Sequence, residues 1–98
     1  MQLKDFDFLS DSTEQTSTRF VTFITPGFHR FDLAIVTTNR FYGKKLVIDL
    51  QSGRSGVLAA DDLEEEGVLE AAYRIDEEQA KELAQFLHMV LGEVHFTD

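Results

Sequence analysis

A short loop between two predicted strands carries the residue types that best suit a small anion. The loop Gln51–Gly56 combines two glycines with Arg54 and the hydroxyls of Ser52 and Ser55. Glycines allow backbone N–H groups to converge on an anion, and a guanidinium with hydroxyls can bind a phosphate or a carboxylate. The loop lacks the length, the lysine and the following helix of a P-loop. The alternative is a plain hairpin connection, because Gly and Ser are ordinary turn residues.

A second loop places aromatic and cationic residues side by side. The segment Asn39–Lys45 contains Phe41 and Tyr42 among three cations, and one of these cations, Arg40, is a candidate to assist anion binding at Arg54. Such a mixture can bind nucleic acid by stacking and phosphate contact, or it can contact an acidic protein surface. The alternative is that the two aromatic rings anchor the loop on the core while the cations stay in water.

The other reactive residue types form no catalytic or metal-binding pattern. His29, His88 and His95 lack ligand spacing, because Gly92 is expected to end a helix between the last two. The acidic run Asp61–Glu66 lacks the spacing of an EF-hand. The chain contains no cysteine, and no Ser/His/Asp arrangement suggests a nucleophile. We therefore expect no catalytic residue, no metal ion and no cofactor.

Charge is distributed unevenly along the 98 residues. The net charge is −9, yet residues 1–60 carry seven basic and six acidic side chains, whereas residues 61–98 carry two basic and twelve acidic ones. Because so acidic a half repels phosphate backbones, we expect no nucleic-acid binding. A basic protein partner fits this half better, and the alternative is a solvated helical surface. The chain has no long apolar run and no signal-peptide pattern, which predicts a cytoplasmic protein that does not enter a membrane.

The hydrophobic pattern predicts one α+β domain over residues 1–98, with residues 1–16 loosely ordered. Strands are expected at Thr18–Thr25, Arg30–Thr37, Lys45–Gln51 and Gly56–Ala60. Their three short connections favour an antiparallel arrangement, because parallel strands need long crossovers. The predicted fold is a four-stranded antiparallel β-meander packed by a C-terminal α-helix.

Two helical segments are expected after the strands. The carboxylates of Asp61–Glu66 suit the start of a short helical segment, which either ends at Gly67 or continues beyond it. The final helix is expected over Glu77–Leu91, where apolar residues recur with a helical period. Asp76 and Gln79 have the spacing of a capping box at its start.

Alternation along the strands predicts a register and two sheet faces. Pairing Ile24 with Phe31, and Ile35 with Ile48, gathers one apolar face for the last helix to cover. The residues of that face would be Phe20, Thr22, Ile24, Phe31, Leu33, Ile35, Ile48, Leu50, Val57 and Ala59. The apolar centre of the opposite face would be formed by Val21, Phe23, Ala34, Val36 and Val47.

That second face is too apolar to remain in contact with water. Three covers are available: the N-terminal residues Phe6, Phe8 and Leu9, a helical segment, or a second copy of the chain. The last of these would make the protein a homodimer whose interface is the second face.

Five blocks of the chain together resemble a known family. They are RFV at 19–21, RFDLAIV at 30–36, RFYGK at 40–44, DLQSGRS at 49–55 and DDLEEEG at 61–67. Over roughly residues 18–90 the chain resembles a family of short, uncharacterised Firmicutes proteins, the domain-of-unknown-function 3055 family. The resemblance implies a bacterial, cytoplasmic origin and a compact α+β domain, and it implies no activity.

Two functional hypotheses follow. In the first, the protein is a non-enzymatic protein–protein interaction or regulatory module that forms a homodimer through the second sheet face. In the second, it binds a small anion or a phosphorylated ligand in the Ser52–Ser55 loop.

Overall fold

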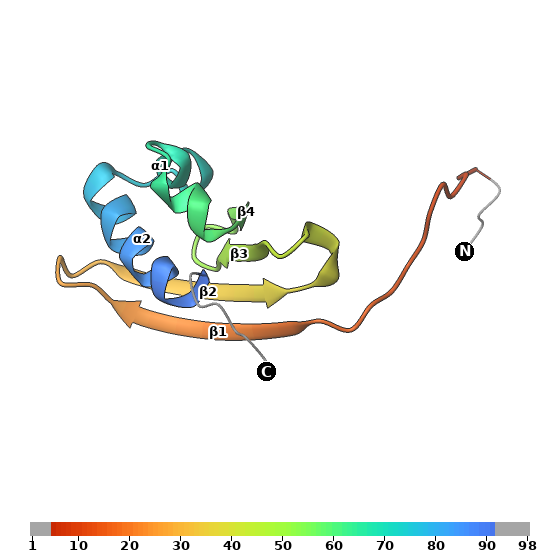
Figure 1. The fold of residues 1–98 in the computed structure, drawn as a ribbon, viewed down its shortest axis with the longest axis horizontal. Helices are drawn as coiled ribbons and strands as arrows, with labels where there is room; N and C mark the ends of the chain where they lie inside the picture. The colour runs from red at the N-terminus through yellow and green to blue at the C-terminus, as the bar shows by residue number, and fades with distance from the viewer. Residues whose placement is uncertain (1–4, 92–98) are drawn as a thin grey trace.

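The four strands form one antiparallel sheet in the order β1-β2-β3-β4 (Figure 1). A computed structural model of the chain describes residues 5–91. The strands are β1 (Ser17–Ile24), β2 (Arg30–Thr37), β3 (Lys45–Asp49) and β4 (Ser55–Leu58). Each strand pairs with the next one in sequence, so the predicted meander is confirmed.

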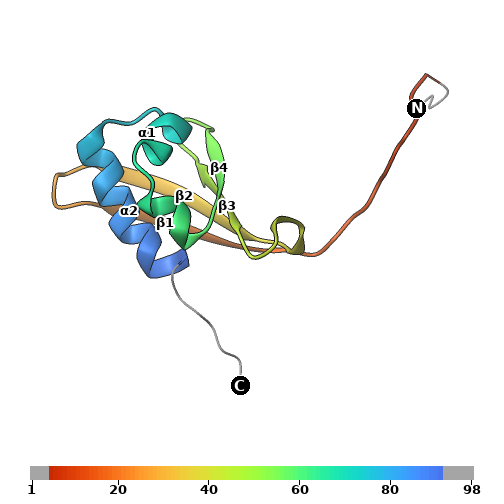
Figure 2. The same ribbon diagram turned by 45° about the horizontal axis from the view of Figure 1, so that its top comes forward.

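The helices that follow β4 pack on one face of this sheet (Figures 1 and 2). They are the 3-10 helix η2 (Ala60–Glu64), α1 (Val68–Tyr73) and α2 (Glu77–Leu91). Gly67 separates η2 from α1 with a positive φ of 81°, a conformation that glycine adopts without strain. The predicted α+β class, with a short helical segment before the last helix, is confirmed. A further 3-10 turn, η1 (Asn39–Phe41), lies in the β2–β3 connection.

The predicted capping box begins α2. The Gln79 N–H donates to Asp76 Oδ1 at 2.8 Å, and the Asp76 N–H donates to Gln79 Oε1 at 3.1 Å. The helix buries one stripe of side chains, formed by Ala80, Leu83, Leu87 and Val90. The expected stop at Gly92 lies outside the described residues. Within residues 5–91, no helix is both long and apolar enough to cross a lipid bilayer.

The core lies between the α2 stripe and the inner sheet face. β2 contributes Phe31, Leu33 and Ile35, and α1 contributes Leu69 and Tyr73. The buried Tyr73 hydroxyl donates to the backbone oxygen of Val47 at 2.7 Å, so α1 is tied directly to β3. Because this hydrogen bond satisfies the one polar group of the ring, Tyr73 can be buried at little cost.

The register between β1 and β2 differs from the prediction by one residue. Val21 lies opposite Leu33, and Phe23 lies opposite Phe31, where Thr22 and Ile24 were expected. The cause is a three-residue turn, closed by a hydrogen bond from the Thr25 N–H to the His29 oxygen at 2.9 Å. The last residue of this turn, Phe28, is left-handed, which is typical of three-residue hairpin loops.

The β2–β3 register is also shifted by one residue, so Val47 rather than Ile48 lies opposite Ile35. β3 ends at Asp49, two residues earlier than predicted. The next turn is closed by the Asp49 N–H, which donates to the Arg54 oxygen at 2.8 Å. As a result β4 starts at Ser55 and pairs Val57 with Leu46, a shift of four residues from the predicted pairing.

Because of these shifts, the side chains of β1, β3 and β4 that were expected beside one set of β2 side chains lie beside the other set, on the opposite side of the sheet. The residues predicted to share the second face are therefore divided between the two sides. Val21 and Phe23 pack against the core, and Val47 is fully buried in it, whereas Ala34 and Val36 point the other way. The predicted composition of the second face was wrong, because a slip of one residue reverses every side chain of a strand.

Residues 5–16 lead away from the folded body and do not cover the sheet (Figures 1 and 2). The side chains of Phe6, Phe8 and Leu9 are exposed. Closer to the body the arm contacts the β2–β3 connection, where Thr38 Oγ1 donates to Glu14 Oε2 at 2.8 Å. Among the described residues, neither the N-terminal apolar side chains nor a helix therefore covers the sheet face that carries Ala34 and Val36.

Candidate functional site

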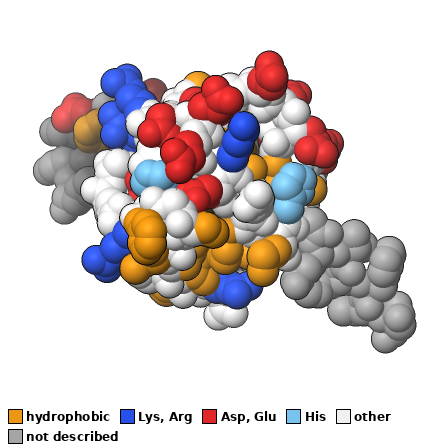
Figure 3. All heavy atoms as spheres, turned by 90° about the vertical axis from the view of Figure 1, so that its left-hand side faces the viewer, with side chains coloured by type: hydrophobic (Ala, Val, Ile, Leu, Met, Phe, Trp, Pro, Cys, Tyr) orange, Lys and Arg blue, Asp and Glu red, His pale blue; other side chains and the backbone are white. Residues whose placement is uncertain are grey.

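The sheet face away from the helices, which we call the outer face, is largely apolar. Phe20 and Ile24 of β1 are 71% and 68% exposed on it. Strand alternation places the following apolar side chains there: Phe20, Ile24, Ala34, Val36, Leu46, Ile48 and Val57. Figure 3, which looks onto the β1–β2 turn, shows hydrophobic side chains gathered on the sheet side and acidic ones on the helical side. A sheet face that remains in water normally carries polar side chains, whereas most side chains on this face are apolar.

The charged groups of the outer face neutralise each other. Thr22 Oγ1 donates to Asp32 Oδ1 at 2.6 Å, and the Arg30 Nε lies 3.4 Å from Asp32 Oδ2. The Thr22 hydrogen bond, helped by the Arg30 guanidinium, lowers the pKa of the Asp32 carboxyl. The carboxylate therefore stays ionised and paired, and the outer face has no net charge on a chain whose net charge is −9.

A second cluster connects the β1–β2 turn to α2 through Glu82. Its Oε1 accepts from Thr25 Oγ1 at 2.6 Å and lies 2.7 Å from His29 Nδ1, and its Oε2 accepts from the Gly27 N–H at 2.7 Å. The turn backbone supports the same arrangement, because the His29 N–H donates to Thr25 Oγ1 at 3.1 Å. One carboxylate of the helix thus holds three groups of the turn.

The contacts in the Glu82 cluster shift the pKa values of His29 and Glu82. The hydrogen bond to Glu82 raises the pKa of His29, and the Glu78 and Asp76 carboxylates act in the same direction. The hydrogen bond from Thr25, and then that from His29, lowers the pKa of Glu82. An imidazolium–carboxylate pair is the form that this geometry favours.

The sequence pattern assigns no role to His29 and none to Glu82. Fifty-three positions separate these residues, and only the β1–β2 turn geometry brings them together. The one local signal is the spacing of Glu78 and Glu82, which lie one helical turn apart on the same face of α2.

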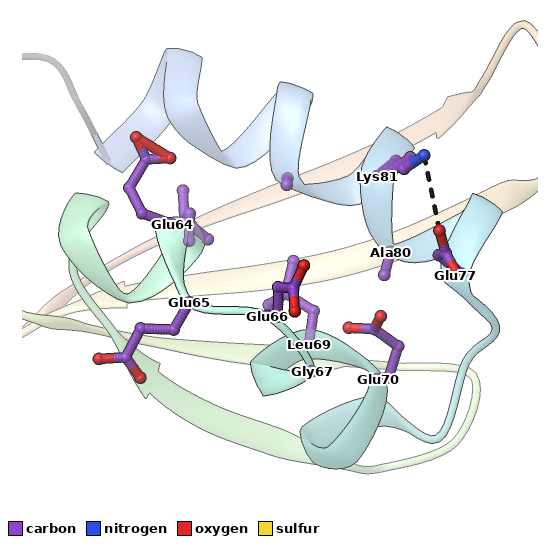
Figure 4. Close-up of a pocket in the computed structure, with 11 residues that line it drawn as sticks. Glu64, Glu65, Glu66, Gly67, Leu69, Glu70, Glu77, Ala80 and Lys81 are labelled. Carbon is purple, nitrogen blue, oxygen red and sulfur yellow. Dashed lines mark ion pairs between the residues drawn. The ribbon is translucent and has the colours of Figure 1, made fainter.

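The acidic half of the chain forms a shallow groove between η2, α1 and α2 (Figure 4). Its floor is apolar, made by Leu63, Leu69, Ala80 and Ala84. Its rim is acidic and consists of Glu64, Glu65, Glu66, Glu70 and Glu77, with Lys81 as the one cation. The Lys81 Nζ lies 3.6 Å from Glu77 Oε1, so this cation is already paired with the rim.

The loop predicted to bind an anion is organised around a carboxylate. Asp49 Oδ1 accepts from the Gln51 N–H at 3.3 Å, and Asp49 Oδ2 accepts from the Ser52 hydroxyl at 2.7 Å. The Ser52 oxygen in turn accepts from the Arg54 N–H at 3.2 Å. The Gln51 N–H and the Ser52 hydroxyl therefore already serve Asp49, whose charge repels an incoming anion. Ser55 is the first residue of β4.

Arg40 does not join this loop, because the β2–β3 and β3–β4 connections lie at opposite ends of β3. Its guanidinium donates instead to the Ser12 hydroxyl in the N-terminal arm at 3.1 Å. Of the two aromatic residues beside it, Phe41 is partly buried and Tyr42 is 98% exposed. Tyr42 therefore does not anchor the loop on the core, as the interpretation with two anchoring rings required.

Comparison with known proteins gives a family and no activity. No curated protein matches the chain. The model of the SAV0927-like family matches residues 9–89, a span that includes the whole sheet and nearly all of α2. The chain therefore belongs to the SAV0927-like family.

Proposed function

We propose that this protein is an interaction module whose partner is a second copy of itself, held through the outer face of the sheet. The observation that carries the proposal is the exposure of Phe20 and Ile24 on a face that neither the helices nor residues 5–16 cover. The resemblance to a Firmicutes family supports a bacterial, cytoplasmic setting for this assembly.

Charge favours a second copy over other occupants. Two chains of net charge −9 repel each other across most orientations. The outer face is an exception, since Arg30 and Asp32 balance each other and its other side chains are uncharged. Copies that meet face to face keep their acidic helical sides apart, whereas a strongly basic partner would gain nothing from a neutral face.

The size of the face sets the expected strength of the dimer. Two eight-residue strands are about 26 Å long, and four strands are about 15 Å across, which gives roughly 400 Å² of flat area. Two such faces bury less than the roughly 1,200–2,000 Å² of a standard stable interface. We therefore expect a dimer that dissociates in the micromolar range.

Sedimentation velocity over a concentration series tests the proposal with matched variants. Phe20→Asp places a charge on the outer face at its exposed ring, and Tyr42→Asp makes the same change at an exposed aromatic residue away from that face. The wild-type chain and Tyr42→Asp should dimerise as concentration rises, and Phe20→Asp should remain a monomer with the same circular dichroism. Phe20→Ser, which adds no charge, should weaken the dimer without abolishing it. Equal dimerisation of the wild-type chain and Phe20→Asp would refute the assigned interface.

The acidic groove supports a second candidate function, which is docking of a basic protein segment. An apolar floor with a carboxylate rim suits an amphipathic segment that carries lysines or arginines beside an apolar side chain. Titration with a lysine-rich amphipathic peptide should give binding that weakens with salt. The triple variant Glu65→Gln/Glu66→Gln/Glu70→Gln should lose this binding, and Asp5→Asn/Asp7→Asn/Asp11→Asn in the exposed arm should retain it. Equal binding by both variants would exclude the groove as the docking site.

A further inference from the structure

We propose that His29, Glu78 and Glu82 form a binding site for a divalent transition-metal ion such as Zn²⁺. Each of the three residues offers a ligand atom, and these atoms all lie within 4.8 Å of one another. One imidazole nitrogen with two carboxylate oxygens is a ligand set that Zn²⁺ accepts, and it leaves a fourth position for water. This role is separate from dimerisation, because the cluster lies where the β1–β2 turn meets α2 rather than on the outer face.

The side chain of Glu78 lacks the partners that hold Glu82. Glu82 has three partners in the turn, whereas the Glu78 side chain forms no hydrogen bond or ion pair with the residues that the structure describes. Glu78 and Glu82 are one turn apart on α2, and two negative charges at that spacing repel each other. An exposed Glu78 side chain would be expected to turn away into water, yet its carboxylate converges with that of Glu82 beside the turn. The His29 imidazolium attracts both carboxylates, and a divalent ion shared by the three residues would hold them together with a larger charge.

The turn backbone leaves space for the two carboxylates at Gly27. A Cβ atom at this position would lie 2.8 Å from Glu82 Oε2 and 2.9 Å from Glu78 Oε1. Real side chains do not tolerate such contacts, so any other residue at position 27 would displace both carboxylates. The turn is thus shaped so that the oxygens approach the backbone closely.

The hydrogen bonds to Glu82 resemble those that orient a metal-ligating carboxylate from the outer coordination shell. Metal-ligating carboxylates in proteins are usually oriented by further donors. Here Thr25 Oγ1 and the Gly27 N–H donate to the two oxygens of Glu82 at 2.6 and 2.7 Å. Both of these donors are uncharged. The positive charge beside Glu82 is that of the His29 imidazolium, so an ion that displaces the imidazolium proton meets an ionised carboxylate.

Ion binding requires one small rearrangement. His29 Nδ1 and Glu82 Oε1 are 2.7 Å apart, which is a hydrogen-bond distance. Two ligand atoms on one tetrahedral Zn²⁺ are about 3.3 Å apart, given Zn–N and Zn–O bonds of about 2.0–2.2 Å. The ion would therefore replace the proton between imidazole and carboxylate and move them apart by about 0.6 Å. His29 lies on a loop and is only partly buried, so its ring has room for this movement.

The test uses the full chain after treatment with a chelator, with Zn²⁺ measured by titration calorimetry and Co²⁺ by its visible absorption. We expect one ion per chain and a higher midpoint of thermal unfolding, because a ligand that binds the folded state stabilises it. Glu78→Gln should weaken binding by more than the roughly 10- to 100-fold loss that follows removal of an outer-shell partner. Glu77→Gln is the matched control, since Glu77 is the adjacent exposed glutamate and pairs with Lys81 instead.

Two histidine variants test whether the ion binds at His29. His29→Gln should abolish binding. His88→Gln should leave binding unchanged, because the His88 Nε2 lies near Glu64 in a separate pair at 3.6 Å. Absence of saturable binding at millimolar Zn²⁺, equal binding by Glu78→Gln and Glu77→Gln, or loss of binding only in His88→Gln would each overturn the proposal.

Discussion

The ring of Phe23 in β1 stacks on the ring of Phe86 in α2, with the two centroids 4.2 Å apart. Phe23 also stacks on Phe31 of the neighbouring strand, at 5.4 Å. This three-ring contact packs the Phe23 side of β1 against the helix. Because side chains alternate along a strand, Phe20 and Ile24 then lie on the outer face.

Replacing Phe23 with alanine should destabilise the fold, whereas replacing Phe20 should not. Loss of a largely buried phenylalanine lowers the free energy of unfolding by about 2–3 kcal/mol, somewhat below the value for full burial. Phe20→Ala removes an exposed ring and should change it by no more than about 0.5 kcal/mol. Urea unfolding of both variants, repeated at two protein concentrations, checks this. Any effect of Phe20→Ala should appear only at the concentration at which the chain is dimeric.

The elements of the fold could be predicted from the sequence, but the register could not. β-branched and aromatic residues mark each strand, and the capping box at Asp76 marks the start of α2. In β1, however, both alternating sets are apolar, since Phe20 and Ile24 compete with Val21 and Phe23. Periodicity alone does not choose between such sets. The choice was made by the turn before β2, in which Phe28 takes a left-handed conformation that the sequence gives little reason to expect.

The candidate sites were even less accessible to sequence reasoning. Arg54 and Ser52 have the right types for an anion site, but the sequence did not indicate that the Ser52 hydroxyl donates to the carboxylate of Asp49, just before the turn. His29 and Glu82 come together only because the β1–β2 turn meets α2. Contacts between residues so distant in sequence depend on the packing of whole elements.

The hydroxyl of Tyr73 should contribute measurably to stability. Tyr73→Phe removes the hydrogen bond to the Val47 oxygen, which costs about 1 kcal/mol. Tyr42→Phe is the matched control, because the side chain of Tyr42 is exposed. This variant should leave the free energy of unfolding unchanged. Urea unfolding measures both. If the two variants lose equal stability, the Tyr73 hydrogen bond has no special role.

Asp62 should make stability depend on pH at the acidic end. The hydrogen bond from the Ala59 N–H at 2.8 Å, and then the Lys44 ammonium at 3.2 Å, lower the pKa of this carboxyl. A carboxyl whose pKa is lower in the folded state stabilises the fold above its unfolded pKa of about 3.9. That contribution disappears as the pH falls through the lower, folded pKa.

The difference in unfolding free energy between wild type and Asp62→Asn should therefore be constant above about pH 5 and shrink below about pH 4. Urea unfolding at a series of pH values measures it. Asp61→Asn removes the same charge from the adjacent exposed residue and serves as control. A difference that persists unchanged at pH 3 would argue against the ionised Asp62 as the stabilising species.

Phosphate should not stabilise the protein through Arg54. The Ser52 hydroxyl and the Gln51 N–H already serve Asp49, and a second anion would meet its charge. Thermal unfolding in inorganic phosphate, compared with sodium chloride at equal ionic strength, should give the same midpoint for wild type and Arg54→Ala. A phosphate-dependent rise that Arg54→Ala removes would contradict this expectation and support the anion-binding hypothesis.

The central claim is that a second copy of the chain covers the outer face, and isotope-filtered nuclear Overhauser measurements on a mixture of labelled and unlabelled chains test it most directly. We predict intermolecular contacts from the ring of Phe20 to methyl groups of Ile48, Val36 and Val57, at concentrations at which sedimentation detects the dimer. The Phe23 ring, which stacks on Phe86, should give contacts only within its own chain. A chain that stays monomeric at the concentrations of that experiment, or a dimer whose intermolecular contacts avoid Phe20, would contradict the account.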